Sequence, residues 1–283
     1  MKKGKFIFLV VLFILISSVS TSEPISFSNL EERNNLYYKK SSDIPFSGQV
    51  KGIKNGRVFN GKIVGLWIAY LTNGNLRYKA NYKNGKLDGL WEFYHKNGRL
   101  HEVGNYKNGK KYGVWSTYFK NGQLSYKASY KEDREDGPFN SYSSDDGRLL
   151  WKGFYKNGKR DGVWEYYYQN GQIEIKDHYK EGKKDGPWEY YYPGGKLHSK
   201  GSYLNGKKDG IMEWFHRNGK LKSIGSYKKG RREGGLWKTY NMKGQLKTKG
   251  YYKNGKKNGP WEVYDEDGQL ERQRNYINGK EIK

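Results

Sequence analysis

Side chains that could do catalytic chemistry are few and scattered in this sequence. Cysteine is absent, so no thiol nucleophile is available. No serine lies in a G-x-S-x-G pattern, and no glycine-rich phosphate loop opens a helical pattern. The histidines lack metal-ligand spacing; they are His95, His101, His178, His198 and His216. We therefore predict a protein that is not an enzyme and that needs no metal and no cofactor.

Acidic residues recur, but in positions typical of turns. Asp88, Asp161, Asp185 and Asp209 each precede a glycine. An aspartate in that place accepts hydrogen bonds from nearby backbone. We interpret these residues as turn formers rather than catalytic carboxylates, and we interpret His95 and His101, which flank the pair Asn97-Gly98, as surface residues.

Positive charge is the stronger functional signal. The chain has 54 Lys and Arg against 29 Asp and Glu, a net charge of +25. Seven lysines directly follow a recurring tyrosine and begin the same turn: Lys83, Lys107, Lys131, Lys156, Lys180, Lys228 and Lys253. If these turns share one edge of a sheet, they lie roughly 10 Å apart, close to the Debye length near 0.1 M salt. We predict a summed positive field that binds an anionic partner; the alternative is that the lysines only keep the turns soluble.

Aromatic runs are the second functional signal. The segments "EYYYQ" and "EYYYP" place tyrosine on both faces of a predicted sheet, through Tyr166, Tyr167, Tyr168, Tyr190, Tyr191 and Tyr192. One face packs inward in this interpretation, and the other offers an aromatic surface to a peptide or glycan. Core packing is the alternative role.

These residues belong to a tandem repeat. Columns of large apolar residues, of leucine or isoleucine, and of tyrosine recur at steps of 24 residues, with two steps of 25 in each column. The first column consists of Trp67, Trp91, Trp115, Phe139, Trp164, Trp188, Met212, Trp237 and Trp261. Short aromatic runs between Asn-Gly pairs predict β-hairpins. The fold class is therefore all-β: an elongated, twisted antiparallel sheet of about nine tandem 24-residue β-hairpin repeats.

The spacing also predicts the register. If Asn97-Gly98 is a two-residue turn, Trp91 faces Gly104. The same arithmetic pairs Trp67 with Ala80, Trp115 with Ala128, Phe139 with Gly153, Trp188 with Gly201, Met212 with Gly225 and Trp237 with Gly250. A ring opposite a missing side chain can lie flat across its neighbour. Asp177 opposite Trp164 and Arg274 opposite Trp261 break the pattern, so we expect looser packing there and fraying at the C-terminal end.

Two repeats are one residue longer than the others. One extra residue falls in "SSDDG", between Tyr142 and Gly147, and the other in "KKGRREGG", between Tyr227 and Trp237. We place both in turns, because an extra residue inside a strand reverses the later side chains unless a bulge absorbs it.

The N-terminal residues differ from the repeats. Residues 1–22 have a basic start, an apolar run from Phe6 to Ile16 and small residues that suit a cut before Glu23, which predicts a secretory signal peptide. An uncleaved anchor is the alternative. Residues 23–49 form an N-terminal segment or degenerate cap, and residues 50–283 the repeat array. Without residues 1–22, which hold three lysines and no acid, the net charge is +22.

The units "NGKKDGPWEYY", "NGKLDGLWEFY" and "NGKKNGPWEVY" resemble the bacterial variant of the MORN repeat. The resemblance covers about residues 50–283 and implies a scaffold or binding module built from successive hairpins. Some bacterial members are similar to antitoxin or immunity proteins, and eukaryotic arrays are linked to lipid binding. Choline- and glucan-binding repeats are a rival resemblance, but they have a shorter period.

We therefore expect a non-catalytic scaffold, exported to the periplasm, cell surface or medium, that binds an acidic protein or a cell-envelope surface. The alternative is an exported antitoxin or immunity-like protein that neutralises a specific toxin. Nucleic acid is an unexpected partner, because export and the lack of a groove-reading motif argue against it. No transmembrane helix is expected in the mature chain.

Overall fold

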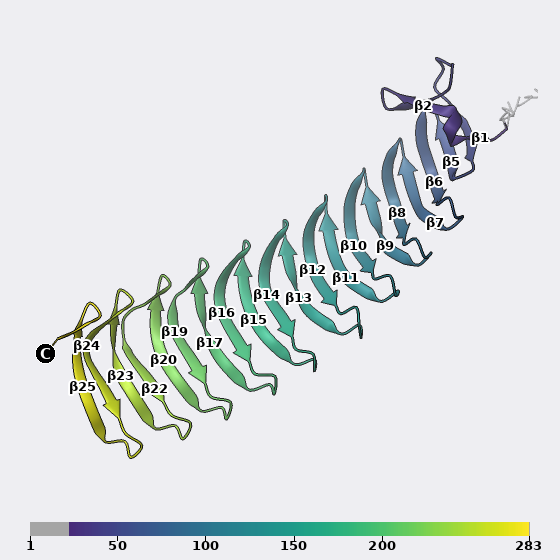
Figure 1. Cartoon of the computed structure of the whole chain (residues 1–283). Helices are drawn as coiled ribbons and strands as arrows, with labels where there is room; N and C mark the ends of the chain where they lie inside the picture. The colour runs from purple at the N-terminus through teal and green to yellow at the C-terminus, as the bar shows by residue number, and fades with distance from the viewer. Residues whose placement is uncertain (1–22, 283) are drawn as a thin grey trace, which may run out of the picture.

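The computed structural model describes residues 23–282, and Figure 1 shows one long, open, twisted antiparallel sheet. The predicted fold class is confirmed. The predicted signal peptide at residues 1–22 lies outside the described residues. Within residues 23–282 no helix has the length and apolar character needed to cross a bilayer.

The repeats alternate two kinds of strand. One kind carries the tryptophan column: β6 (Lys62–Tyr70), β8 (Lys86–Tyr94), β10 (Lys110–Tyr118), β12 (Arg134–Tyr142), β14 (Lys159–Tyr167), β16 (Lys183–Tyr191), β18 (Lys207–Lys208) with β19 (Gly210–Phe215), β21 (Arg231–Arg232) with β22 (Leu236–Tyr240), and β24 (Lys256–Tyr264). The other kind ends on the tyrosine column: β7 (Leu76–Lys83), β9 (Leu100–Lys107), β11 (Leu124–Lys131), β13 (Leu149–Lys156), β15 (Ile173–Lys180), β17 (Leu197–Leu204), β20 (Leu221–Lys228), β23 (Leu246–Lys253) and β25 (Leu270–Ile277), followed by β26 (Lys280–Ile282).

The turns after the tyrosine column are the tight ones. Lys83 pairs with Lys86, and the two residues between them, Asn84 and Gly85, have φ values of 52° and 81°. Positive φ at both central positions defines the type I′ turn, which favours Asn-Gly because glycine has no Cβ and asparagine tolerates the left-handed region. These turns lie along the upper edge in Figure 1, and the longer connections lie along the lower edge.

The turns after the tryptophan strands are not the two-residue turns that we predicted. Tyr94 pairs with Leu100, so the connection has five residues, 95–99, in which Gly98 N–H donates to the carbonyl of His95 at 2.9 Å. A bulge between Phe93 and Tyr94 then restores the alignment of Trp91 with Gly104. The predicted register is therefore confirmed although the turn type is wrong, and the other predicted pairings are confirmed in the same way.

A second bulge interrupts each tryptophan strand. Between β7 and β8, Tyr82 pairs with Leu87 but Ala80 pairs with Trp91, so residues 88–90 bulge out of the ladder. The extra residue near Tyr227 enlarges this bulge at Gly234 and Gly235, between β21 and β22, and not a turn as predicted. The other extra residue does lie in a turn, at residues 143–148.

The tryptophan column forms the core of a single-layer sheet. Trp67, Trp115 and Trp164 have at most 1% of their surface exposed. Five of the rings lie over a glycine of the preceding strand and not, as we predicted, over the partner in their own hairpin: Trp67, Trp115, Trp164, Trp237 and Trp261. Trp188 differs, because a Cβ added to its predicted partner Gly201 would lie 2.9 Å from its Cζ2 atom. A Cβ added to Gly104 would lie 2.2 Å from Cδ2 of Trp115, which belongs to the next repeat.

Side chains of the same sheet cover these rings. Lys111 Nζ lies 3.9 Å from the ring centroid of Trp115, and the Arg160 guanidinium 4.2 Å from that of Trp164. Tyr106 meets Trp115 edge-to-face at 5.0 Å between centroids. Cation–π and edge-to-face contacts thus replace the second layer that a sheet normally needs.

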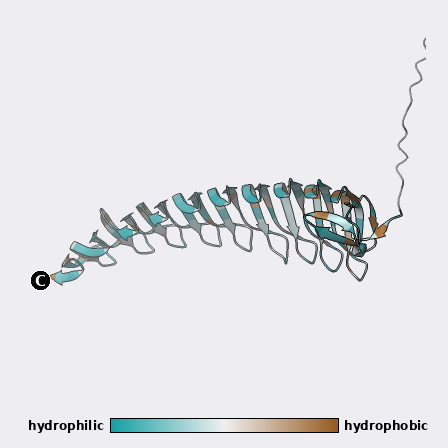
Figure 2. Ribbon diagram, turned by 90° about the horizontal axis from the view of Figure 1, so that it is seen from above, coloured by the Kyte–Doolittle hydropathy of each residue, from teal (hydrophilic) through white to brown (hydrophobic). Residues whose placement is uncertain are grey.

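The two ends of the array differ. The N-terminal end has β1 (Ile25–Ser26), the 3₁₀ helix η1 (Phe27–Asn29), β2 (Leu30–Arg33), β3 (Leu36–Lys39), β4 (Gly48–Lys51) and β5 (Lys54–Phe59). Leu30, Val50, Val58 and Trp67 form a small buried cluster there, and Figure 2 shows more hydrophobic ribbon at this end than along the repeats. At the C-terminal end almost all of β25 is exposed.

The expected looser packing at Asp177 is wrong. Trp164, its register partner, is 0% exposed, and Asp177 itself is 2% exposed. The carboxylate Oδ2 lies 2.7 Å from Nζ of Lys184, so the buried charge has a partner. By contrast, Trp261 beside Arg274 is only half-buried.

Candidate anion-binding edge

The seven predicted lysines lie together at the tight-turn edge. Each is the last or nearly last residue of a strand, each is exposed, and each faces a second cation across its turn. We call these paired residues the turn-cation row. It comprises Lys83 with Lys86, Lys107 with Lys110, Lys131 with Arg134, Lys156 with Lys159, Lys180 with Lys183, Lys228 with Arg231, and Lys253 with Lys256.

The charges of this row are largely uncompensated. Among the described residues, the one ion pair that involves the row joins Lys110 Nζ and Glu132 at 3.6 Å. Like charges directly opposite each other on neighbouring strands disfavour pairing. The repeated Lys–Lys pairs therefore do not stabilise the turns that they close.

Several cations within the strands, by contrast, are paired with an acid. On the face opposite the tryptophans, Lys152 Nζ lies 2.8 Å from Glu165, which also accepts a hydrogen bond of 2.6 Å from the Tyr167 hydroxyl. Hydrogen bonds to Glu165 and Tyr167 raise the pKa of Lys152 to about 12. Equivalent pairs join Lys200 to Glu213 and Lys249 to Glu262, both at 2.7 Å.

The aspartates that precede glycine accept backbone hydrogen bonds, as predicted, but from the next repeat and not from their own turn. They lie in the strand bulge rather than in the turn, and each accepts a hydrogen bond from the backbone of the next repeat. Asp88 Oδ2 accepts from Asn108 N at 3.0 Å, and Asp185 Oδ2 from Asn205 N at 2.9 Å. Each carboxylate thereby holds the next tight turn at a fixed spacing.

Hollows lie between consecutive tight turns. One of about 300 Å³ is lined by Lys107, Lys110, Lys111 and Lys131, together with Tyr112 and Glu132. Another of about 610 Å³ is lined by Lys156, Lys159 and Lys180 and by the acids Asp161, Glu181 and Asp185. A third of about 470 Å³ includes Lys207, Lys228 and Arg231. Cations from two successive repeats therefore meet in each hollow.

The six predicted tyrosines do not join the lysines. All six are half-buried. Tyr168 and Tyr192 lie at the lower edge, where their hydroxyls donate to the carbonyls of Tyr191 and Phe215 at 2.6 and 2.9 Å. Burial raises the pKa of Tyr166 and of Tyr191 to about 12. Their hydroxyls bond to the protein itself, and Tyr168, Tyr190, Tyr191 and Tyr192 also line a hollow of about 330 Å³, so the aromatic surface stays a prediction.

The lower edge contains a ladder of asparagines that the sequence analysis missed. Asn97 Nδ2 donates to the carbonyl of Lys120 at 3.0 Å, and Asn121 and Asn170 make the same bond to Ser144 and Pro193. The signal was present in the recurring Asn of each Asn-Gly pair, which we read only as a turn former.

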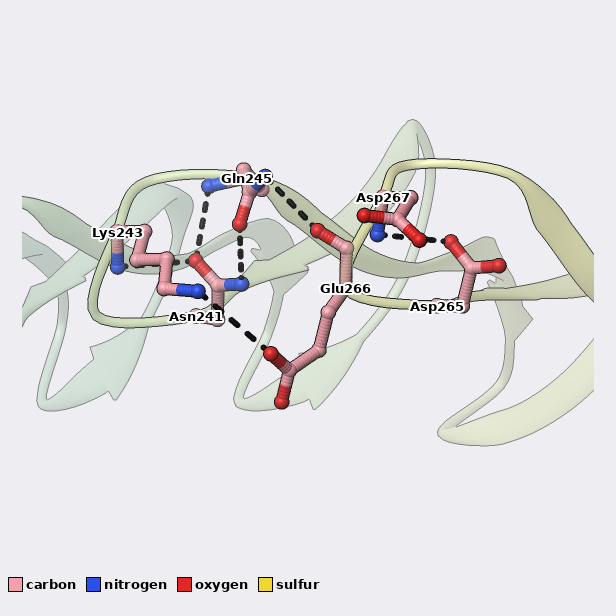
Figure 3. A network of polar contacts seen from close by, with 6 residues as sticks. All are labelled: Asn241, Lys243, Gln245, Asp265, Glu266 and Asp267. Atoms are coloured by element: carbon pink, nitrogen blue, oxygen red, sulfur yellow. Dashed lines mark hydrogen bonds and ion pairs between the residues drawn. The ribbon is translucent and has the colours of Figure 1, made fainter.

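Figure 3 shows how the ladder continues where that asparagine is missing. Lys243 occupies its place, and Gln245 Nε2 donates instead to the carbonyl of Glu266 at 2.9 Å, while Lys243 Nζ lies 3.5 Å from the Glu266 carboxylate. Side-chain hydrogen bonds therefore join consecutive repeats at both edges, from aspartates at the tight-turn edge and from side-chain amides at the lower edge.

His95 and His101 are half-buried and in contact, not separate surface residues. Their Nε2 and Nδ1 atoms are 3.1 Å apart, and both lie within hydrogen-bond distance of the Tyr118 carbonyl. Within residues 23–282 no group of three or more His, Cys, Asp or Glu side chains is arranged to hold a metal ion.

Comparison with known proteins gives a family match over most of the chain. The family model described as MORN repeat variant matches residues 63–84, 87–108, 111–132, 160–181, 184–205, 208–229, 233–254 and 257–278. The matched spans skip the repeat with Phe139 in the tryptophan column and the longer turn at residues 143–148. No curated protein matches the chain.

Among solved structures, similarity is found to toxin-complex chains. The "Crystal Structure of TcdB2-TccC3-Cdc42" shows 12% identity over 89% of this chain and 16% of that chain, with a TM-score of 0.22. The Photorhabdus luminescens Tc holotoxin pore shows 13% identity over 80% of this chain and 13% of that chain, with a TM-score of 0.15. The chain thus spans less than a fifth of these proteins, and similarity at this level gives no information about function.

Proposed function

The chain belongs to the MORN repeat variant family, and we propose that it is a non-catalytic repeat scaffold that binds an anionic partner through the turn-cation row. The observation that carries the proposal is the set of like-charged pairs across the tight turns, seven of which recur at one edge of the sheet. These like-charged pairs disfavour folding and have few ion-pair partners within the protein. Their charges are therefore available to bind an anionic partner.

The electrostatics support such a role. Successive turns lie roughly 10 Å apart, slightly more than the Debye length of about 8 Å at physiological salt, so their fields are partly screened but still overlap. Overlapping positive fields raise the local concentration of an anionic partner and speed its association. The net charge, which is +22 without residues 1–22, adds to the same effect.

A binding titration tests this proposal. Residues 23–283 would be titrated against three anionic probes: polyglutamate, polyphosphate and vesicles that contain an anionic lipid. We expect at least one of them to bind with an affinity that falls steeply between low and high salt. Binding releases counterions from the charged groups, and this release is less favourable when the salt concentration is high. Salt-independent binding to any of them, or binding to none, would contradict the proposal.

A matched pair of variants locates the site. Lys107, Lys131, Lys156 and Lys180 changed to Gln remove four charges from the row, whereas Lys96, Lys120, Lys196 and Lys222 changed to Gln remove four exposed charges at or near the lower edge. The first set should weaken binding by ten-fold or more and the second much less. Equal losses would show that net charge, and not the row, binds the partner. A tight, stoichiometric and salt-insensitive complex with one protein would instead support the toxin-neutralising alternative.

Export is a separate part of the proposal and rests on residues 1–22. Cell fractionation and N-terminal sequencing of the native protein test it. We expect a mature chain that starts at Glu23 outside the cytoplasm; an intact Met1 in the cytoplasm would contradict export.

A further inference from the structure

From the arrangement of the turn-cation row we infer that its occupant is a flexible linear polymer with phosphate groups along its chain, lying along the edge across successive tight turns. This inference rests on the proposed function and names the class of partner. The cations form a line and not a compact cluster, since eight tight turns from Asn84-Gly85 to Asn254-Gly255 follow one edge. At two strand spacings per repeat, the line is roughly 70 Å long.

Positive charge is nearly continuous along this line. Lys107 and Lys131, from consecutive turns, line one hollow, and Lys156 and Lys180 line another. A chain that leaves one turn therefore meets the cations of the next without crossing a neutral gap. The turn Leu204–Lys207, in which leucine replaces one lysine, still contributes Lys207 to the third hollow.

The aspartates in the hollows are already engaged by the protein, whereas Glu181 is exposed beside Lys180. Asp161 Oδ1 accepts a hydrogen bond from Glu181 N at 3.4 Å, and Asp185 Oδ2 one from Asn205 N at 2.9 Å. These carboxylates bond to the backbone of the turns, whereas the lysine side chains at the strand ends are exposed. The exposed surface presented to a partner is therefore dominated by ammonium groups.

The shape of the edge favours a flexible chain over a flat surface. In Figure 1 the tight turns follow a bowed line that rises more steeply toward the N-terminal end, and Figure 2 shows the array as an arc from above. A flat bilayer can approach only some turns of a bowed and twisted edge at once. A flexible polymer can follow all of them.

The residue types in the row favour binding of phosphate groups over stacking on the bases of a nucleic acid. Twelve of the fourteen cations in the row are lysines, whose compact ammonium groups bind phosphate as point charges. Proteins that bind single-stranded nucleic acid combine a basic groove with aromatic side chains that stack on bases. Here Tyr112 is the exposed aromatic ring among the cations of one hollow, whereas Tyr168 and Tyr192 lie at the opposite edge with bonded hydroxyls.

Chain length provides the test, with inorganic polyphosphate as the probe. We would compare tripolyphosphate with polyphosphate long enough to span roughly 70 Å, at equal phosphate concentration, by calorimetric titration of residues 23–283. Each added turn makes the next contact intramolecular, so the long chain should bind about 100-fold or more tightly than the short one. The variant with Lys107, Lys131, Lys156 and Lys180 changed to Gln should lose most of this gain, whereas the lower-edge control variant should keep it.

The other outcomes separate this inference from the proposed function. Equal affinity for short and long polyphosphate, or binding to anionic vesicles or polyglutamate but not to polyphosphate, would overturn the linear phosphate polymer and leave an anion-binding edge. Failure of all probes to bind would overturn both. Circular dichroism of each variant shows whether a loss of binding reflects unfolding.

Discussion

In repeats whose bulge has the regular length, the residue of the preceding strand beside each indole determines whether the indole N–H finds a partner. Trp115, Trp164 and Trp261 lie over glycines of the preceding strand, and their Nε1 atoms donate to the carbonyl ten residues earlier at 3.1–3.2 Å. Trp91 lies beside Ala80 and Trp188 beside Asp177, and both indole N–H groups are buried without a partner. A Cβ beneath the ring thus keeps the indole from its hydrogen bond.

Glycine at this position is therefore predicted to matter for stability. Gly153→Ala would place a Cβ 2.3 Å from Cδ2 of the fully buried Trp164, so the ring must move and its bond to the Phe154 carbonyl is lost. We expect a loss of about 1–3 kcal/mol in the free energy of unfolding, measured by urea denaturation. The reverse change, Ala80→Gly beneath Trp91, should be near neutral, because the cost of glycine in a strand is offset by the indole bond that becomes possible. Equal effects of the two changes would refute this account of the ring.

Asp177 and Lys184 give a second test at this scale. Burial lowers the pKa of Lys184, but its hydrogen bonds to Asp177 and Tyr190 outweigh burial and raise it above the ordinary value. A raised lysine pKa contributes stability at all pH values below the unfolded value near 10.5, so the pair is intact at neutral pH.

The two single changes should differ sharply. Lys184→Ala leaves the Asp177 carboxylate buried without its cation and should cost about 3–5 kcal/mol in the free energy of unfolding. Asp177→Gly restores the pattern of the other repeats and lets Trp188 settle over a glycine, so it should be neutral or stabilising. Thermal unfolding of the two variants measures this difference, and a strongly destabilised Asp177→Gly would contradict it.

At the scale of the strand, the two extra residues lie in different kinds of place, one in a connection between strands and one in a bulge within a strand. The extra residue at 143–148 lengthens a connection, where it changes no pairing, and the one at Gly234-Gly235 enlarges a bulge that every tryptophan strand already has. Trp237 lies over Gly225 but its Nε1 has no partner, unlike the other rings over glycine. In this longer bulge the equivalent carbonyl, that of Ser226, accepts a hydrogen bond of 3.0 Å from Glu233 N.

Deleting Gly235 should therefore be tolerated. The deletion restores the 24-residue period and makes the carbonyl of Ser226 the one ten residues before the tryptophan, in reach of its indole N–H. We expect an unchanged or higher melting temperature by circular dichroism. Deleting Ser226, within β20, is the control and should destabilise strongly, because later side chains of that strand change faces. Equal loss in both variants would refute the bulge as the site of the insertion.

The tyrosine column predicts how the sheet responds to alkali. Burial raises the pKa of Tyr82 to about 12, and the pKa of Tyr106, Tyr130 and Tyr203 is raised for the same main reason. An unfolded tyrosine has a pKa near 10. The folded state thus keeps protons that the unfolded state releases, so stability is full below about pH 10 and falls as the pH rises toward 12.

Tyrosinate absorbance and circular dichroism, followed together between pH 9 and pH 13, check this prediction. The buried tyrosines should ionise in the same transition in which the β signal is lost. Gradual ionisation near pH 10 with an intact β signal would contradict the burial of the column.

Sequence alone predicted the strands and their register, but not the turn details. The alignment of Trp91 with Gly104 is the same for a two-residue turn as for a five-residue connection followed by a bulge, so spacing cannot distinguish them. Nor can spacing tell which neighbour a ring covers, because Trp91 lies between Ala80 and Gly104 in register. The bulge at residues 88–90 lies directly before Trp91, and the direction in which it turns the ring cannot be derived from residue spacing.

The candidate edge was predicted as far as position and charge. The period of the lysines places them on one edge, and the structure adds the second cation across each turn. The sequence did not indicate where the tyrosine runs lie relative to these lysines. Tyr168 and Tyr192 lie at the opposite edge, since a strand of about nine residues separates its two ends by roughly 30 Å.

At the scale of the whole molecule, the sheet is a chain of nearest-neighbour contacts. Each strand of the array pairs with the strands before and after it, and the inter-repeat bonds at both edges join one repeat to the next. Stability should then be a sum of repeat and interface contributions. The N-terminal end has a buried cluster, whereas β25 is exposed, so opening should begin at the C-terminal end.

Removal of one whole repeat tests this modular account most directly. Deleting residues 87–110 joins Lys86 to Lys111 and places Trp115 beside Ala80, the same kind of neighbour that Trp91 has in the native sheet. The measurement is the far-ultraviolet circular dichroism of the shortened chain, before and during thermal unfolding. Our account predicts the same β signal per residue as the full chain and a cooperative transition; loss of the β signal would contradict it.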